Sequence, residues 1–307
     1  MTISLRSSLA AAAAALALAG GPGSAHAAVK VLACEPEWAA LVQELGGPLV
    51  DVQSATTALQ DPHRIQARPS LLARARQAEL LACTGAELEA GWLPILLQQS
   101  GNPRIQPGQP GHFMAADGVG KLGVPAAADR SQGDVHAAGN PHIQTDPRRI
   151  ATVATGLAAR LRQVDPANAA EYSRREADFA RRWGEAQARW QAQAAPLKGM
   201  PVAVQHASFA YLQDWLGLKE VAVLEPKPGV EPSAAHLRSV LGTLQATPAK
   251  AVLYAAYQDP RPSEWLSREA RIPAVKLPFT VGGTEGAGTL FTLFDDTLAR
   301  LRAAAGQ

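Results

Sequence analysis

The chain has 307 residues, with 29 Lys or Arg and 27 Asp or Glu, so its formal net charge is +2. This balanced charge, without any polybasic block, excludes the electrostatic signature of a protein that binds nucleic acid or an anionic membrane. The length rules out one small domain and allows two lobes, each with its own core. We therefore expect a small or very local ligand.

The first 27 residues are typical of a secretory signal. Arg6 precedes the apolar run "LAAAAAALALAG", and the small residues Ala25 and Ala27 flank His26 at the end of the segment. The sequence therefore predicts cleavage near Ala27/Ala28 and export of the mature chain. A membrane anchor is the competing interpretation, but the run is shorter than the roughly 20 residues that a spanning helix needs.

Strands and helices are expected to alternate from residue 28 onwards. Such βαβ units predict a parallel sheet with helices on its faces. Residues 102–140 break the rhythm, because they are rich in Gly and Pro and show no sustained periodicity; a loop of this length is usually functional or mobile. The expected strands are 29–34, 48–56 and 79–85, and the expected helices are 37–47, 69–78 and 87–101.

Two helices follow this loop, and the second, at about 166–195, carries a stripe of aromatic residues. Tyr172, Phe179, Trp183 and Trp190 recur at spacings that keep them on one face, which predicts a packing seam rather than a ligand pocket. A helix of this length spans roughly 45 Å and would run along two lobes.

The strand and helix rhythm then returns, with strands expected at 199–206, 221–226, 249–256 and 273–279. Two sheet-containing lobes joined by a helix would form a cleft, because ligands bind beyond the carboxyl ends of parallel strands. The predicted organisation is a signal peptide at 1–27, an N-terminal βα lobe at 28–165, a connecting helix at 166–195 and a C-terminal βα lobe at 196–307.

Two cysteines, Cys34 and Cys83, each end an expected strand. In an oxidising compartment two such residues usually pair, and a disulfide is expected if the two strands are neighbours in the sheet. Two buried free thiols are the alternative. A metal site is less favoured, because the cysteines are not spaced as a chelating pair.

Three histidines lie where the expected strands end. His63 follows the second strand, His142 precedes the helix that begins near residue 147, and His206 ends the strand of the second lobe. A Pro-containing turn precedes both His63 and His142, and a strand end precedes His206, so all three side chains are held by rigid backbone. Three neutral imidazoles gathered from separate segments suit a divalent ion such as Zn²⁺. We therefore predict a metal site made of His63, His142 and His206.

The remaining histidines are weaker candidates for metal binding. His112 and His136 lie in the irregular 102–140 loop, and His236 lies on an expected helix. His26 is removed with the signal.

An open tri-histidine site would also suit a catalytic zinc, so a zinc-dependent hydrolase or hydratase is an alternative function. The sequence contains no HExxH helix, no Gly-x-Ser-x-Gly elbow and no Gly-rich phosphate loop. These absences favour a binding protein over an enzyme.

Four segments resemble the cluster A-I metal (zinc/manganese) solute-binding proteins of bacterial ABC importers. They are "DPHRIQARPS", "DVHAAGNPHIQTDP", "VQHASFAYLQDWLGL" and "EPKPGVEPSAAHL", and they occur in that family's order. The resemblance covers nearly all of residues 29–303. It implies an α/β fold with two βα lobes, a long connecting helix and a metal site in the cleft between the lobes. It also implies a periplasmic protein, expected to be a monomer, that delivers a divalent ion to a cognate ABC permease in the inner membrane.

The resemblance further implies that His63 and His142 come from the first lobe and His206 from the second. Many members of the family supply a carboxylate ligand in the segment that is "LPFTVGGTEGAG" here, and the matching position is Val281. We therefore expect water as the fourth ligand, with Glu285 as the alternative. Three imidazoles favour zinc, because harder ions prefer oxygen ligands. A manganese-binding importer component and an adhesin are the remaining alternatives.

Overall fold

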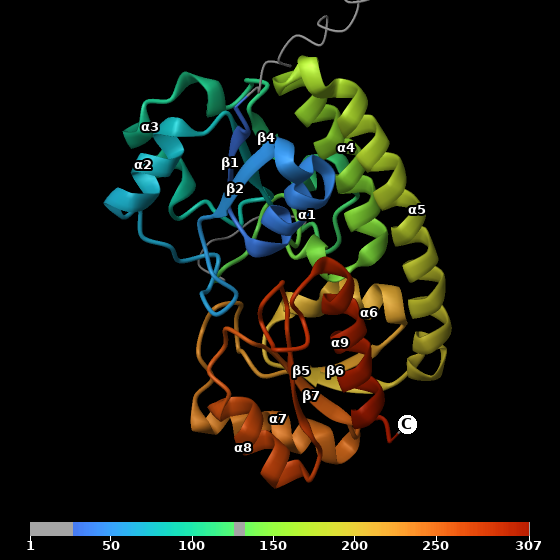
Figure 1. Ribbon diagram of the computed structural model, residues 1–307. Helices are drawn as coiled ribbons and strands as arrows, with labels where there is room; N and C mark the ends of the chain where they lie inside the picture. The colour runs from blue at the N-terminus through green and yellow to red at the C-terminus, as the bar shows by residue number, and fades with distance from the viewer. Residues whose placement is uncertain (1–26, 126–132, 307) are drawn as a thin grey trace, which may run out of the picture.

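The computed structural model describes residues 27–125 and 133–306, so residues 1–26 of the predicted signal lie outside the described residues. Two four-stranded sheets have the strand orders β2-β1-β3-β4 and β6-β5-β7-β8. Every strand pairing in both sheets is parallel. Each sheet forms the centre of one lobe, with helices around it (Figure 1). The predicted α/β fold class is confirmed.

The first lobe follows the predicted rhythm with two differences. The helix expected at 87–101 begins only at Leu93: Glu87 has a positive φ angle that a right-handed helix cannot contain, and the N-cap Trp92 has a φ of −143°. A short edge strand, missed in the irregular loop, pairs with β3. The elements are β1 Val29–Ala33, α1 Pro36–Gly46, β2 Val50–Ser54, α2 Pro69–Gln77, β3 Leu80–Cys83, α3 Leu93–Ser100, β4 His112–Met114 and α4 Pro147–Val164.

The second lobe repeats the same construction. Its strands begin and end within a few residues of the expected positions, because each is a short apolar run. The elements are β5 Pro201–Val204, α6 Ala210–Leu216, β6 Lys219–Val223, α7 Ala234–Ala246, β7 Ala251–Ala255, α8 Arg261–Ala270, β8 Ala274–Leu277 and α9 Leu290–Ala304.

The long helix α5, Ala169–Ala194, runs along one side of both lobes (Figure 1). Its predicted aromatic stripe is buried. Within it, the Trp183 ring stacks on Phe179 with 5.1 Å between centroids and meets Phe294 of α9 at 5.6 Å. The stripe is therefore a packing seam, as expected.

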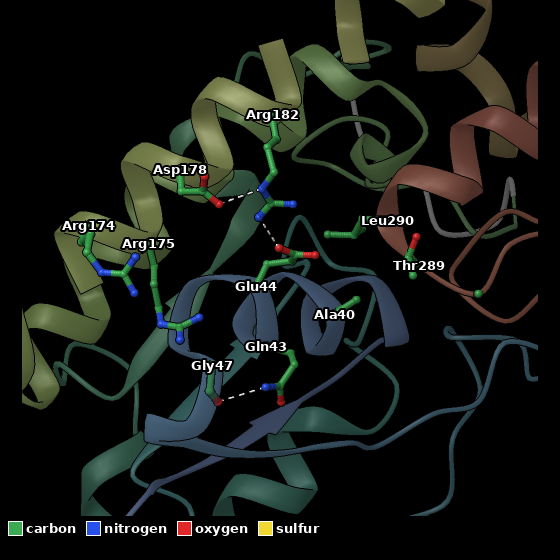
Figure 2. Close-up of a pocket in the computed structure, with 11 residues that line it drawn as sticks. Ala40, Gln43, Glu44, Gly47, Arg174, Arg175, Asp178, Arg182, Thr289 and Leu290 are labelled. Carbon is green, nitrogen blue, oxygen red and sulfur yellow. Dashed lines mark hydrogen bonds and ion pairs between the residues drawn. The ribbon is translucent and has the colours of Figure 1, made fainter. Parts of the chain in front are cut away.

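Ion pairs add to this seam on the side of the first lobe. Arg182 of α5 donates to Glu44 of α1 at 2.7 Å and to Asp178 of its own helix at 2.8 Å (Figure 2). These residues border a hollow of about 450 Å³ between α1, α5 and the start of α9. Among the described residues, no helix combines the length and apolar character needed to cross a membrane.

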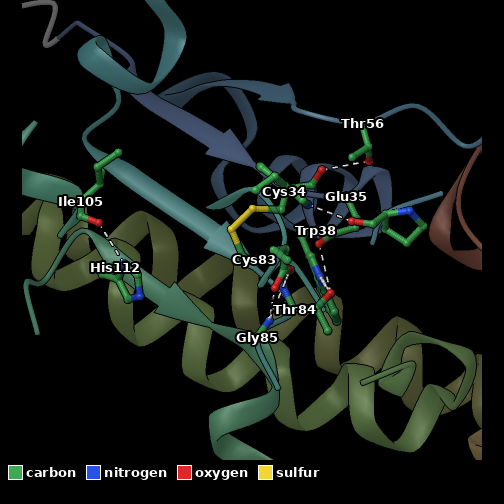
Figure 3. The surroundings of a disulfide bond; sticks show 12 residues. Cys34, Glu35, Trp38, Thr56, Cys83, Thr84, Gly85, Ile105 and His112 are labelled. Atoms are coloured by element: carbon green, nitrogen blue, oxygen red, sulfur yellow. Dashed lines mark hydrogen bonds between the residues drawn. A yellow bond between two sulfur atoms is a disulfide. The ribbon is translucent and has the colours of Figure 1, made fainter. Parts of the chain in front are cut away.

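Cys34 and Cys83 form a disulfide in the structure, across a sequence separation of 49 residues (Figure 3). Cys34 follows β1 and Cys83 ends β3, and these strands are neighbours in the sheet. Both residues are fully buried. The bond therefore joins the central strands of the first lobe at their carboxyl ends.

Candidate metal centre

Three histidine side chains meet between the lobes. One ligand atom from each of His63, His142 and His206 lies within 4.8 Å of the other two. The ring centroids are 5.3 Å apart for His63 and His142, 6.0 Å for His63 and His206, and 5.7 Å for His142 and His206. The folded chain thus brings together residues that are more than 60 positions apart in sequence. These are the three histidines that the strand-end argument selected.

His63 is positioned by the turn that precedes it. Asp61 Oδ1 accepts the backbone N–H of His63 at 3.0 Å and lies 2.7 Å from its Nδ1. The indole of Trp92 donates to the carbonyl of Pro62 at 2.9 Å, which fixes the turn against α3. Burial acts to raise the pKa of Asp61, but the hydrogen bonds and charge of His63 outweigh it and lower that pKa. Asp61 is therefore ionised and orients the ring so that Nε2 is left for a ligand.

His206 has the same kind of partner from the neighbouring strand. Its Nδ1 lies 2.6 Å from Glu225 Oε2, and that oxygen also accepts the backbone N–H of Gly229 at 2.7 Å. Glu225 follows β6, which pairs with β5 just before His206. A carboxylate behind a metal-binding imidazole fixes its tautomer and increases its basicity.

His142 is the most deeply buried of the three, with 1% of its surface exposed. Its backbone N–H donates to Asn140 Oδ1 at 2.9 Å, and the Asn140 amide donates to the carbonyl of Ala207 at 2.8 Å. Asn140 therefore fixes the position of His142 in one lobe relative to the segment that follows His206 in the other lobe. Burial, and then the neighbouring histidines, lower the pKa of His142 well below its ordinary value.

Within the three-histidine group, two buried imidazole nitrogens lack hydrogen-bond partners among the described residues. They are His63 Nε2 and His142 Nδ1. An orphaned buried polar atom is costly unless a ligand satisfies it. Imidazoles with free nitrogens, two of them backed by carboxylates, fit a borderline divalent cation.

An apolar wall closes one side of the group. Phe279 has a φ of +65° and is 5% exposed, and its ring lies 5.4 Å from that of His142 and 5.1 Å from that of Tyr257. A non-glycine residue in the left-handed region is uncommon and is typically kept at functional sites. The next residue, Thr280, donates its hydroxyl to Glu37 of the first lobe. This contact joins the wall to both lobes.

The structure does not bring the alternative ligand Glu285 into the group. Its side chain is exposed on the turn after β8, and Val281 packs against the core. Among the described residues, the metal-ligating group between the lobes consists of the three histidines alone. Possible ligand atoms of Cys34, Cys83 and Glu89 also lie within 4.8 Å of one another, but the two cysteines are bonded to each other in the disulfide.

The other histidines differ in their distance from this centre. His112 Nδ1 bonds the carbonyl of Ile105 at 2.9 Å, and His236 lies on α7. His136, in contrast, stacks on His63 with 5.4 Å between ring centroids. Its position was not singled out by sequence, because irregular loops show no periodicity that orients a side chain.

Sequence reasoning also missed the two carboxylates that orient the rings. Asp61 stands two residues before His63, so the local Asx-type turn was visible in "DPH". Glu225 ends the strand next to that of His206, and the parallel pairing of consecutive strands was the available signal.

The model of the family described as "ZnuA: Zinc-uptake complex component A periplasmic" matches residues 31–304, which is nearly the whole chain. The chain belongs to this family. It is thus a metal-binding substrate-binding protein of an ABC importer, with a membrane permease as its partner, and it is not an enzyme.

Similar proteins include named importer components. The "Manganese ABC transporter substrate-binding lipoprotein PsaA" of Streptococcus pneumoniae is 21% identical over 257 residues, covering 82% of this chain and 80% of that protein. The "Iron ABC transporter substrate-binding lipoprotein MtsA" of Streptococcus pyogenes serotype M1 is 21% identical over 259 residues, with the same shares covered.

Solved structures with the same fold include one titled "Crystal structure of ZnuA". It has a TM-score of 0.74 and 23% identity, covering 90% of this chain and 99% of that one. The Mn-bound periplasmic metal binding protein of Candidatus Liberibacter asiaticus has a TM-score of 0.72 and 16% identity, covering 89% and 98%. At these identities the likeness concerns the fold, and the choice of metal depends on the ligands of the site itself.

Proposed function

We propose that this protein captures Zn²⁺ in the periplasm with His63, His142 and His206 and delivers it to its permease. The observation that carries the proposal is the convergence of three buried imidazoles whose ligand atoms lie within 4.8 Å of one another. Two of these rings are oriented by carboxylates, at 2.7 Å and 2.6 Å from Nδ1. A water molecule takes the fourth coordination position, because Glu285 is exposed.

Zinc is favoured over manganese by the donor set. Mn²⁺ prefers carboxylate, carbonyl and water oxygens, whereas imidazole suits Zn²⁺. Both carboxylates beside the rings, Asp61 and Glu225, are engaged by imidazole nitrogens and each also accepts a backbone N–H. The relatives named for manganese and iron are too distant in sequence to decide the metal for this chain.

The proposal includes export and a division of labour between the lobes. Residues 1–27 act as the signal, with cleavage near Ala27/Ala28, and the mature protein acts as a monomer. The N-terminal lobe, 28–165, supplies two ligands and the C-terminal lobe, 196–307, supplies the third, so that the ion bridges the lobes, while the helix at 166–195 spans both.

The first prediction tests the bridging ligand. Loss of a group that only orients a metal ligand weakens metal binding by about 10–100-fold. Loss of the ligand itself in His206→Ala should therefore weaken zinc binding by more than about 100-fold. The variant should also lose most of the zinc-induced rise in melting temperature, because a ligand stabilises a protein only through its affinity for the folded state. Calorimetric titration and melting curves with and without zinc measure both effects.

His236→Ala is the matched control, because it removes an imidazole from α7, away from the three-histidine group. It should bind zinc as the wild type does. Titration of the wild type with zinc in the presence of excess manganese completes the test. Zinc affinity preserved in His206→Ala, or manganese outcompeting zinc, would refute the proposed site or the proposed metal, respectively.

A further inference from the structure

One histidine outside the three-histidine group lies directly against it. The ring of His136 stacks on that of His63 with 5.4 Å between centroids and 27° between planes. This separation is within the range of the centroid distances inside the group itself. Among the ring contacts of the described residues, His136 meets His63 but neither of the other two ligands.

The free nitrogen of His136 has no structural role among the described residues. Its Nε2 atom is buried and has no hydrogen-bond partner, as is also true of Nε2 of His63. A buried nitrogen that no protein group satisfies is available to a ligand or a water molecule, and at His136 this nitrogen lies on a ring stacked against a ligand of the proposed site. The stacking brings two such imidazoles side by side.

Both rings border a hollow of about 320 Å³ whose lining also includes the carboxylates of Glu87 and Asp134 and the guanidinium of Arg64, which lies 3.6 Å from Asp134 Oδ2. His142 is not on that lining and is almost completely buried. An ion in this hollow would therefore have access to His136 and His63 but not to His142.

Backbone hydrogen bonds on both sides of His136 hold it in place. The N–H of Ala137 donates to Glu87 Oε2 at 2.6 Å, and the N–H of Asp134 donates to the carbonyl of Pro228 in the second lobe at 2.9 Å. Glu87 itself has a φ of +68°, an uncommon conformation for a non-glycine residue. The segment that carries His136 is thus fixed to both lobes beside the site.

We propose that His136 and His63 form an outer metal position through which a divalent ion enters and leaves the three-histidine site. This inference rests on the proposed function. His63 belongs to both positions, so the ion can exchange one ligand at a time instead of leaving three imidazoles in one step. A two-imidazole position binds more weakly than three, which suits a station on the entry path of a buried site.

An intermediate binding position lowers the activation free energy of both zinc association and zinc release. It leaves the free energies of the apo and zinc-loaded proteins unchanged. His136→Gln should therefore slow zinc association and chelator-driven zinc release alike, each by roughly tenfold, which corresponds to about 1.4 kcal/mol in the barrier. The equilibrium constant, as the ratio of the two rates, should change by less than about threefold. Stopped-flow mixing of apo protein with zinc, and of zinc-loaded protein with a chelator, measures both rates.

His112→Gln is the matched control, because it makes the same change at the other histidine of the 102–140 segment and should leave both rates at the wild-type values. His136→Ala repeats the test without a hydrogen-bonding side chain. Unchanged rates in both His136 variants would overturn the proposal. An affinity loss of about 100-fold with faster release would also overturn it, because it would make His136 a resident ligand.

The Co²⁺-loaded protein separates this inference from the proposed function. The visible absorption of bound Co²⁺ reports the resident ligands, so His136→Gln should keep the wild-type spectrum whereas His206→Ala should lose it. If His206→Ala retained the wild-type spectrum, the proposed three-histidine site would fail. If only His136→Gln changed the spectrum, the outer position would fail and the search for a fourth ligand would move to His136.

Discussion

Three buried carboxyl groups lie on the first lobe near the metal centre. Burial raises the pKa of Glu37 and of Glu89 to about 7 and raises that of Glu35 well above its ordinary value. Thr84 donates its hydroxyl to Glu35 and its backbone N–H to Glu89, and Glu37 accepts the hydroxyl of Thr280 from the second lobe. Protonation of this cluster is therefore linked to folding and to the seam between the lobes.

The pKa of Glu37 predicts how stability depends on pH. Because the folded state raises this pKa above the unfolded value, the contribution of Glu37 is complete below about pH 4.5 and is lost as the pH rises through about 7. Glu37→Gln should accordingly flatten the fall in melting temperature of the apo protein between pH 5 and pH 8. Melting curves of wild type and variant across this range measure the difference, and Glu185→Gln, at an exposed position, is the control. Parallel pH profiles in Glu37→Gln and wild type would contradict the assignment.

At the scale of secondary structure, the disulfide joins two adjacent strands of the first sheet. α1 follows the carboxyl end of β1, and the turn with positive φ angles that includes Glu87 follows β3. The bond therefore fixes the relative positions of two segments that lead to the site (Figure 3). Its separation of 49 residues makes the closed loop long enough for a substantial effect on the unfolded chain.

Cys34→Ala/Cys83→Ala should lower the free energy of unfolding of the first lobe by about 4 kcal/mol, the loop-closure estimate for this separation. The zinc affinity should change little, because the cysteines are not among the three histidine ligands. Denaturant unfolding and zinc titration of the double variant measure the two quantities. Thiol counting on the denatured wild type gives a direct check: two reactive thiols would contradict the disulfide.

At the scale of the whole molecule, several contacts hold the two lobes together. The helix α5 packs against α1 and α4 of the first lobe and α9 of the second. Asn140 donates to Ala207, Thr280 donates to Glu37, and the N–H of Asp134 donates to Pro228. A continuous helix resists bending more than a flexible linker does, so a wide hinge motion is not expected.

Zinc binding should therefore change the overall dimensions very little. We expect the radius of gyration to differ by less than about 1 Å between the apo and zinc-loaded proteins, because only small tilts of packed elements are available. Small-angle X-ray scattering on both forms measures this difference, and His206→Ala with added zinc serves as the unliganded reference. A decrease of several Å on zinc binding would show that the lobes close by a hinge.

The sequence by itself determined the alternation of strands and helices, the aromatic seam of α5 and the three histidines. The first two features are local, because a buried strand or an amphipathic helix is visible in consecutive residues, and each histidine was found by the strand end or rigid turn beside it. The boundaries of α3 and the strand β4 were missed or misplaced. Positive φ angles at Ala86 and Glu87 have no sequence signature as clear as glycine, and a three-residue strand shows no period.

Only the tertiary structure decided which side chains meet. Parallel pairing of β5 with β6 brings Glu225 to His206, and the stacking of His136 on His63 depends on how an irregular loop folds back between the lobes. The exclusion of Glu285 depends on the direction of one turn. Such contacts join residues far apart in sequence, and their geometry follows from packing, which no local pattern of residues encodes.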